Sequence, residues 1–403
     1  MSTSLLYHGF GIRDYRHLKT EYQHGTIVFH IEKKDSRRYC KLCLSRDVIK
    51  FGRVSRRLRT VPIGAKKVFL EVHLHRLKCK NCGTIALEPL EIAYPKKSWT
   101  KALGRYVVEL LKHTTVKDVA EHLGMSWDTV KDIHEQDLEK KLKRRSLKGL
   151  RYIGIDEISV GKGHKYLTIV VDLESGEVVW VGDGRDSQSL EDFFKRLKRS
   201  KAQIKAVAMD MWPAYVSAVL KYFPSEVIVY DKYHIIADCN RMLDELRRKE
   251  ARQASLIEKK IFLGTRYLLL KGQEKIKDKK EAKEKLERLL KLNKPLNTAY
   301  LLKEELRQLW ACEDREKAKD YLENWLSKAF ASGIRLVMKF AKKVSKFKNQ
   351  ILNWFGKPVT TAVVEGINNK IKVLKRQAYG FRDMRYFKLR IYFIRSATYA
   401  LFG

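Results

Sequence analysis

The chain has 403 residues, of which 44 % are hydrophobic, and its 84 Lys and Arg against 47 Asp and Glu give a formal net charge of +37. This apolar content is enough to bury the cores of about two or three domains, so the chain is not simply a basic disordered tail. No apolar run approaches the roughly 18 residues that a bilayer span needs, and the first residues lack a signal-peptide stretch. Neither an integral membrane protein nor a secreted one is therefore expected.

The charge is unevenly distributed along the chain. Residues 1–150 carry a net charge of +16, residues 151–240 carry −1, residues 241–350 carry +14 and residues 351–403 carry +8. Such an excess indicates a polyanionic partner, because Lys and Arg that neutralise phosphates release counterions. The near-neutral middle segment is where we expect a site that collects carboxylates around cations.

Four cysteines form two C-x-x-C pairs separated by 35 residues, Cys40 with Cys43 and Cys79 with Cys82. Paired thiolates of this kind bind tetrahedral zinc, and four of them leave no open position, so the expected metal is structural. The alternating residues 68–75 predict a strand, and a β-rich zinc ribbon is expected over residues 1–95. Cys239 and Cys312 are isolated and are interpreted as ordinary thiols.

The next segment, residues 96–148, has a helix-turn-helix pattern. Apolar residues recur at helical spacing at Val116, Val119, Ala120 and Leu123. Gly124 can adopt the left-handed turn, and Ser126 can cap a second helix, so Ser126–His134 is predicted to enter a major groove. A plain packing hairpin is the alternative. The residues predicted to contact DNA are Ser126, Trp127, Thr129 and Lys131, with Arg56 and Arg57 of the preceding segment.

Residues 149–250 predict an α/β domain. Three strands, the last two joined by a hairpin turn, precede an alternation of helices and strands, in the order βββαβαβα. This is the strand order of the RNase H-like fold, which places the middle of the first strand beside the end of the fourth. Asp156 and Asp210 fall at those two places.

Two carboxylates on adjacent strands are costly unless cations neutralise them. Two magnesium (or manganese) ions about 3.5–4 Å apart would do so, with Glu365 of a helix-like stretch as the third ligand. Asp231 is the alternative second acid, or lies behind the ligands with His234. His234 would orient a water or contact the scissile phosphate, or it is a helix-capping histidine.

Several motifs carry a resemblance that covers nearly the whole chain. They are the two C-x-x-C pairs, Arg59–Gly64, Gly154–Glu157, Met209–Pro213, Asp231–Ile235, Val364–Arg376 and Ala378–Arg382. In this order and spacing the chain resembles the DDE transposases of insertion sequences of the ISL3 family, which carry a zinc ribbon ahead of a helix-turn-helix.

The resemblance implies a DNA transposase that binds the inverted repeats at element ends. Water would be the nucleophile for the first cut, and the freed 3′-hydroxyl would then attack target DNA. Asp156, Asp210 and Glu365 would bind the two magnesium ions. The residues expected to line the path of the strand are Asn369, Lys372 and Arg376. The separation of 155 positions from Asp210 to Glu365 implies an insertion that contacts DNA or is a helical spacer.

The expected organisation is an α/β RNase H-like catalytic core with a helical insertion, preceded by a β-rich zinc ribbon and an all-α helix-turn-helix. Its segments are the zinc ribbon 1–95, the helix-turn-helix 96–148, the first part of the core 149–250, the Lys-rich insertion 251–350 and the last part of the core 351–403. The expected partner is double-stranded DNA, at element ends and target, bound by a homodimer or larger assembly in the cytoplasm at the nucleoid, with no membrane.

Two other function classes compete with this one. A zinc-ribbon, helix-turn-helix regulator that binds DNA without cutting it explains residues 1–150 but leaves the central acids without a purpose. An RNase H-like structure-selective nuclease keeps the acids, although nucleases of the resolvase type are usually shorter chains.

Overall fold

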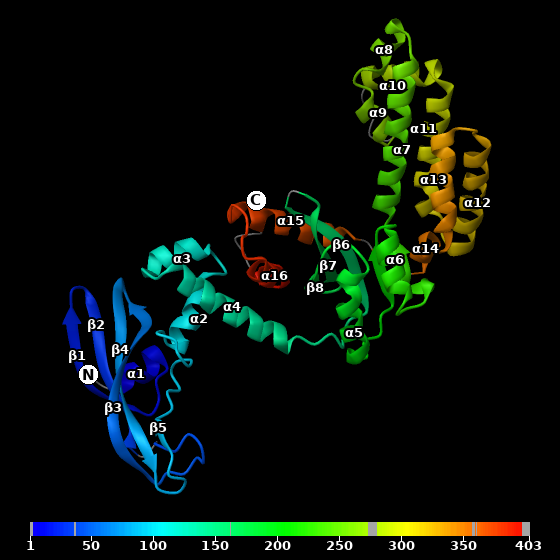
Figure 1. Ribbon diagram of the computed structural model, residues 1–403. Coiled ribbons are helices and arrows are strands. Elements are labelled where there is room, and N and C mark those ends of the chain that lie inside the picture. The colour runs from blue at the N-terminus through cyan, green and yellow to red at the C-terminus, as the bar shows by residue number, and fades with distance from the viewer. Residues whose placement is uncertain are drawn as a thin grey trace. The chain divides into compact units, whose positions relative to one another are not determined.

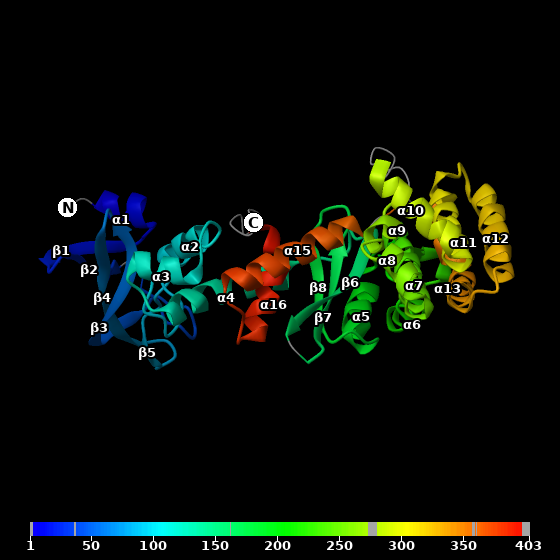
Figure 2. The ribbon, with the colours of Figure 1, turned by 90° about the horizontal axis from the view of Figure 1, so that it is seen from above.

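The computed structural model describes residues 3–35, 38–161, 163–272, 280–356, 359 and 361–396 (Figure 1; Figure 2). The chain folds as two compact units: unit one combines the residues up to Arg144 with those from Val373 onward, and unit two spans Arg145–Lys372. Within the described part of the chain, no helix combines the length and the apolar character that a bilayer crossing requires.

A five-stranded sheet forms the first part of unit one. Its strands are β1 Tyr15–Gln23, β2 Thr26–Lys33, β3 Val48–Ile63, β4 Lys66–Cys79 and β5 Ile85–Leu87. The order is β1-β2-β4-β3 with β5 on β4, and β2 pairs with β4 in parallel. Val68, Leu70, Val72 and Leu74 are completely buried, which confirms the strand predicted from alternation over residues 68–75. Helix α1, Thr3–Phe10, buries Leu6 in the same core.

Four helices complete unit one. They are α2 Lys101–Leu110, α3 Val116–Leu123, α4 Trp127–Arg144 and α16 Met384–Tyr392. The predicted helix-turn-helix is present: Gly124 adopts a left-handed φ of 58° and ends α3. The second helix is longer than the predicted Ser126–His134, because α4 continues to Arg144 through a charged stretch that includes the i,i+4 pair Asp137–Lys141.

Helix α16 packs against α4, where Tyr386 and Leu389 join the core of the helix-turn-helix. Its neighbour α15, Ala362–Gln377, begins in unit two, which ends at Lys372. The segment 351–403 therefore starts in one compact unit and finishes in the other.

A second five-stranded sheet, in the order β10-β9-β6-β7-β8, forms the base of unit two. The strands are β6 Tyr152–Gly161, β7 Lys165–Asp172, β8 Val178–Asp183, β9 Ala206–Met209 and β10 Ile228–Tyr230. The pairs β6–β7 and β7–β8 are antiparallel, whereas β9 pairs with both β6 and β10 in parallel. The predicted sequence of three antiparallel strands followed by parallel additions is confirmed.

The helices of unit two follow the sheet strands and then form the insertion. Two lie between the last strands, α5 Glu191–Ser200 and α6 Pro213–Leu220, and the long helix α7 Lys232–Gln253 follows β10. The insertion contains α8 Leu256–Phe262, α9 Arg266–Leu270, α10 Lys280–Leu292, α11 Lys294–Gln308, α12 Arg315–Ala331, α13 Arg335–Lys346 and α14 Lys348–Leu352.

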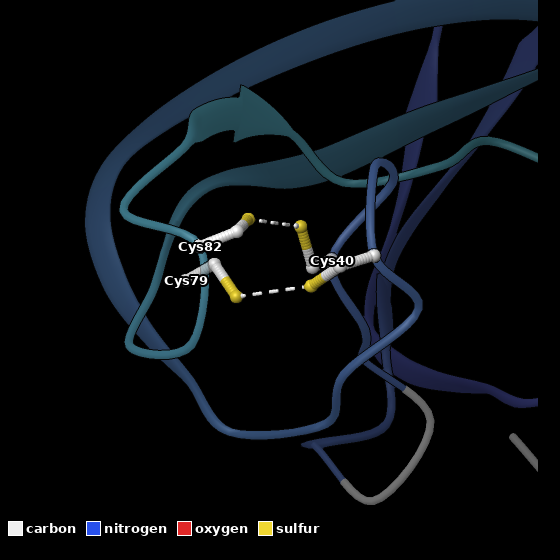
Figure 3. Close-up of side chains that lie close together, drawn as sticks. Cys40, Cys79 and Cys82 are labelled. Carbon is white, nitrogen blue, oxygen red and sulfur yellow. Dashed lines mark hydrogen bonds between the residues drawn. The ribbon is translucent and has the colours of Figure 1, made fainter.

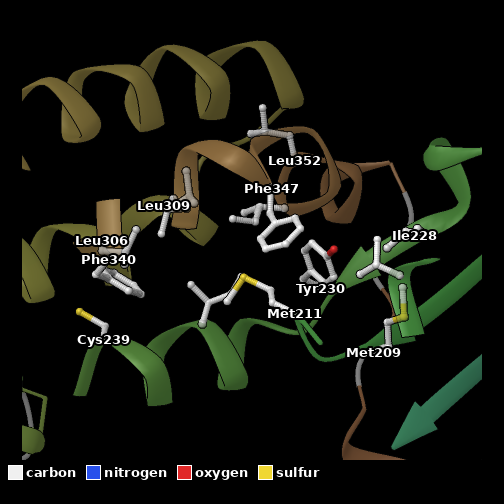
Figure 4. Close-up of a cluster of buried hydrophobic side chains, with 14 of the residues drawn as sticks. Met209, Met211, Ile228, Tyr230, Cys239, Leu306, Leu309, Phe340, Phe347 and Leu352 are labelled. Atoms are coloured by element: carbon white, nitrogen blue, oxygen red, sulfur yellow. The ribbon is translucent and has the colours of Figure 1, made fainter. Parts of the chain in front are cut away.

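One hydrophobic core runs from the sheet of unit two into the insertion. Figure 4 shows Met209 and Tyr230 near the strands together with Cys239 of α7 and Phe340 of α13, and all four are buried. Leu302, Leu306 and Trp310 of the insertion join this core, whereas the neighbouring Leu301 is 58 % exposed. A core shared in this way couples the insertion to the strands that carry the central aspartates.

Candidate active site and metal centre

The two central aspartates lie on neighbouring parallel strands. Ile155 of β6 is in register with Met209, the last residue of β9, so Asp156 and Asp210, which follow them in the chain, lie at the same end of the paired strands. This is the juxtaposition that the sequence predicted. Burial raises the pKa of the Asp156 carboxyl to about 6, and the nearby Asp210 adds to this shift.

Helix α15 packs closely against β6, the strand that carries Asp156, at the position of Gly154. A Cβ atom on Gly154 would lie 2.4 Å from Val364 Cγ2, so only glycine permits the observed approach of the helix to β6. One turn along α15, the buried Asn368 donates a hydrogen bond from Nδ2 to Asp156 Oδ2 at 2.7 Å, while its Oδ1 has no hydrogen-bond partner.

The third acid, Glu365, lies in the first turn of α15 and is exposed. Among the described residues, only the four cysteines bring three or more potential metal ligands within 4.8 Å of one another, so the three acids are not gathered that closely. Asn368 contacts Asp156, but it is not among the site residues predicted from the sequence. Its position three residues after Glu365, on nearly the same helical face, could have indicated this role.

Both carboxylate oxygens of Asp231 accept hydrogen bonds from backbone amides. Its Oδ1 accepts from the amide of Tyr233 at 2.6 Å and so caps α7, and its Oδ2 accepts from the amide of Thr361 at 2.6 Å. Thr361 directly precedes α15, and its carbonyl accepts from the Glu365 amide. Asp231 is therefore a positioning residue for the helix that carries Glu365.

His234, in the first turn of α7, contacts Asp210 directly. Its Nδ1 lies 2.7 Å from Asp210 Oδ1. Burial lowers the pKa of the imidazole, but the hydrogen bond and the charge of Asp210 outweigh this effect, so the pKa is raised overall. The contact with Asp210 distinguishes His234 from a histidine that only caps its helix.

Two further charged residues lie near the pair. Burial raises the pKa of Glu157, Asp210 adds to the shift, and attraction to Arg185 opposes it. The guanidinium of Arg185 lies 4.5 Å from the ring centre of Tyr166 and 5.2 Å from that of Trp212. These rings hold a cation near Glu157, which the sequence did not predict, because Arg185 belongs to the loop after β8.

The raised pKa of Asp156 has a consequence for stability. A carboxyl group whose pKa is higher in the folded state stabilises that state at low pH, and this contribution is lost as the pH rises through about 6. We therefore expect magnesium-free Asp156→Asn protein to become more stable than the unmodified protein above pH 6, by roughly 3 kcal/mol at pH 8.

Urea unfolding at pH 5 and pH 8 measures this difference, with Asp192→Asn on the exposed surface of α5 as the control. Magnesium should stabilise the unmodified protein at pH 8 and leave Asp156→Asn unchanged. Equal stability of Asp156→Asn and the unmodified protein at both pH values would contradict the burial of an ionised carboxylate.

The four cysteines come together at one end of the first sheet (Figure 3). The Sγ atoms of Cys40 and Cys82 are 3.6 Å apart, and those of Cys43 and Cys79 are 3.5 Å apart. A tetrahedral zinc with Zn–S bonds of about 2.3 Å sets sulfurs about 3.8 Å apart, so these thiols fit such an ion.

The backbone builds this cluster from two equivalent turns. In each C-x-x-C pair, the residue four positions after the first cysteine donates its amide to that cysteine's carbonyl at 3.0 Å, namely Leu44 and Gly83. Both have a left-handed φ, 61° and 71° respectively. Hydrogen bonds from Thr84 lower the pKa of the Cys82 thiol to about 6, which favours the thiolate that a metal needs.

The residues predicted to read DNA occupy different environments. Ser126 Oγ accepts from the Thr129 amide and caps α4 as predicted, and Trp127 is 48 % exposed. Lys131 Nζ lies 2.5 Å from Asp383 Oδ2, so this side chain must leave an ion pair before it contacts a phosphate or a base.

The predicted phosphate contacts also differ from one another. Arg56 donates to the carbonyl of Lys97 at 2.8 Å, whereas Arg57 is exposed and lies over the ring of Phe69. On α15, Asn369, Lys372 and Arg376 are all exposed.

Comparison with known proteins identifies two matching family models. A model for DDE-type transposases of family ISL3 matches residues 153–391, and a model for the helix-turn-helix domain of transposase family ISL3 matches residues 88–135.

Individual proteins match over most of the chain. The transposase for insertion sequence element IS1001 of Bordetella parapertussis is 34 % identical over 370 residues, which is 91 % of each chain. The transposase for IS1557 of Mycobacterium tuberculosis is 30 % identical over 359 residues, covering 81 % of this chain and 79 % of that protein. The Drosophila P element transposase strand transfer complex aligns with 73 % of this chain and 91 % of that chain, at a TM-score of 0.40 and 10 % identity.

Proposed function

The chain belongs to transposase family ISL3, and we propose that it binds the inverted repeats at the ends of its element and performs metal-dependent DNA strand cleavage and strand transfer. The observation that carries the proposal is the pair Asp156 and Asp210 on neighbouring parallel strands, with α15 packed against the same edge. A DNA-binding regulator has no use for two carboxylates so placed.

The sheet of unit two is, in this proposal, an RNase H-like core. Support comes from its strand order β10-β9-β6-β7-β8 and from the mixture of antiparallel and parallel pairs. The proposed segments are 1–95, 96–148, 149–250, 251–350 and 351–403, of which the last contributes to the core up to Lys372, where unit two ends.

Asp156, Asp210 and Glu365 are the proposed ligands of two magnesium or manganese ions. Carboxylate oxygens are the donors that these hard cations prefer, and the unpartnered Oδ1 of buried Asn368 offers a further oxygen beside them. When bound, such ions supply charge neutralisation at the attacking and leaving oxygens of a phosphodiester.

The remaining residues act through contacts already described. His234 orients Asp210, and Asp231 holds the start of α15, the helix that carries Glu365. Arg185, held between Tyr166 and Trp212, is placed to attract a DNA phosphate toward the acids. Asn369, Lys372 and Arg376 are proposed to contact the strand that enters this site.

The four-cysteine cluster is proposed to hold a structural zinc, as its geometry and closed thiolate set favour. The proposed assembly on DNA is a dimer or a larger complex that joins two element ends, acting in the cytoplasm at the nucleoid. Two active sites are needed because a transposon has two ends to cut.

The proposal is tested by incubating the purified protein with magnesium and end-labelled DNA that carries both ends of its element. We expect magnesium-dependent cuts at the element ends and joined products with a target duplex. Binding without cutting would favour the regulator, and cutting that ignores sequence but follows branched DNA structure would favour the nuclease.

Specific recognition is expected to reside in residues 1–150. Their net charge of +16 supplies affinity for any DNA, whereas the first turn of α4 offers side chains that can reach base edges. Trp127→Ala with Thr129→Ala should reduce the preference for element ends over random DNA by about tenfold or more, at 1–3 kcal/mol per lost base contact, with little change on random DNA.

Competition binding at fixed salt measures this preference, with Lys117→Ala on the exposed surface of α3 as the control. The recognition role would be wrong if a chain that begins at Arg151 distinguished element ends as well as the full chain does.

A further inference from the structure

A cavity of about 950 Å³ lies between α7 and α13 in unit two, away from the carboxylate pair. Six of its lining side chains are cationic: Arg248, Lys249 and Arg252 from α7, and Arg335, Lys339 and Lys342 from α13. Glu245 is the only acidic residue among the described residues that line it. These six cations and the space between them are called the basic groove below.

The two walls of the basic groove are regular. Positions 248, 249 and 252 share one face of α7, and positions 335, 339 and 342 share one face of α13, because helical neighbours recur every three or four residues. An ion pair at 2.6 Å between Asp238 of α7 and Lys343 of α13 joins the walls. Behind them Leu243 and Phe340 pack in the common core, so the cations project from a rigid base.

Most of these cations have no ion-pair partner in the part of the chain that the structure describes. Among the residues that the structure describes, Arg248 forms an ion pair with Asp244. The other five groove cations form none there: Lys249, Arg252, Arg335, Lys339 and Lys342. By contrast, the lysines of the neighbouring helix α12 are each paired with a glutamate: Lys317 with Glu313, Lys319 with Glu316 and Lys328 with Glu305. Like charges held together without partners create a strongly positive potential that favours a polyanion.

The side chains and backbone amides that line the groove favour phosphate groups over unpaired bases. None of the described residues that line the groove is aromatic, so these residues offer no surface on which unpaired bases could stack. No side chain caps the N-terminus of α13, where the helix begins at Arg335, and free amides at a helix start favour phosphate oxygens. We propose that the basic groove binds the phosphate backbone of duplex DNA.

This proposal rests on the proposed function and adds a second DNA contact at a defined distance from the cut. Helix α7 links the two places, because His234 contacts Asp210 in its first turn and the groove begins eleven residues later at Glu245. At 1.5 Å per residue, the groove lies about 16 to 27 Å along α7 from His234. In this proposal the duplex runs along α7, so at 3.4 Å per base pair the distance corresponds to about 5 to 8 base pairs. Figure 1 shows α7 extending from the sheet alongside α13.

The first experiment measures the salt dependence of binding to a random 30-base-pair duplex, without magnesium, so that cleavage plays no part. The variant Arg335→Gln/Lys339→Gln/Lys342→Gln removes three groove charges, and Lys317→Gln/Lys319→Gln/Lys328→Gln removes three paired charges from α12. Loss of three phosphate contacts should reduce the slope of log K against log salt by about 2 to 3, whereas the α12 variant should keep the original slope. Between 50 and 200 mM salt, the unmodified protein should lose about 40-fold more affinity than the groove variant.

The second experiment replaces single phosphates of an element-end duplex by neutral methylphosphonates. A methylphosphonate placed about 5 to 8 base pairs from the cut should weaken DNA binding by the unmodified protein but not by the groove variant. Neutral positions beyond about 12 base pairs should affect both proteins equally.

Equal slopes for the groove and α12 variants would overturn the proposal, as would a loss of affinity seen only with single-stranded DNA. Circular dichroism and thermal unfolding check that both variants fold. Because the first experiment requires no cleavage, a failure of the groove is distinguishable from a failure of the proposed transposase chemistry.

Discussion

Replacing Asp156, Asp210 or Glu365 by Ala is expected to remove most magnesium-dependent cleavage of element-end DNA. Each residue contributes carboxylate oxygens to the proposed metal site, and the bound charge stabilises both the attacking and the leaving oxygen in the transition state. We expect a loss of at least about 4 kcal/mol in transition-state stabilisation, or roughly a thousandfold in rate, in a single-turnover assay with labelled DNA.

DNA binding should survive these substitutions. Removing a carboxylate from a surface that faces phosphate lowers repulsion, so affinity for element ends should stay equal or increase. Calcium, which accepts the same oxygen ligands in a looser geometry, should support binding without cutting.

Asp231→Ala is the internal control for the second acid. Its carboxylate accepts from the amides of Tyr233 and Thr361, so its loss should cost about 1 kcal/mol of stability through the cap of α7 and reduce cleavage less than Asp210→Ala does. Near-normal cleavage by Asp210→Ala beside an inactive Asp231→Ala would overturn the assignment of Asp210, although it would not change the fold.

Removal of zinc should have the largest effect on unit one. The free energy of binding a structural zinc, about 10–16 kcal/mol in small zinc modules, is coupled to local folding. Cys43→Ser or Cys82→Ser should therefore lower the zinc content, unfold the loops between β2 and β3 and between β4 and β5, and weaken binding to element ends. Metal analysis and proteolysis of these loops measure the two effects.

Cys312→Ser is the matched control, because this thiol is isolated and only partly buried. It should leave the zinc content unchanged. Cleavage of a pre-nicked substrate at high concentration should also suffer less in the zinc-ligand variants than binding does, since the carboxylates belong to unit two. An absence of zinc in protein purified without chelators would refute the assignment.

Much of this protein is determined by local sequence. The alternation of apolar residues from Val68 to Leu74 favours a half-buried strand, because only a strand places alternate side chains on one face. Gly124, between two segments with apolar residues at helical spacing, favours a left-handed turn that lets both helices bury their apolar faces. The strands that bring Asp156 beside Asp210 were predictable for the same reason, together with the limited ways in which parallel strands can be connected.

Other features depend on residues that are distant in sequence. Asn368 meets Asp156 because α15 packs on Gly154, and Asp231 holds Thr361 across 130 residues, which no periodicity in either segment indicates. Lys131 was predicted to face DNA, but its charge lies beside Asp383, 252 residues away.

The basic groove illustrates the same division. The sequence by itself predicted a Lys-rich helical insertion over residues 251–350, since composition and spacing are local properties. Only the tertiary structure decided which of these lysines are paired with acids, as Lys328 is with Glu305, and which, like Lys339 and Lys342, share a groove without partners among the described residues. The physical reason is that a charge is neutralised by whatever the fold places within a few ångströms of it, and that neighbour is set by packing rather than by the order of residues along the chain.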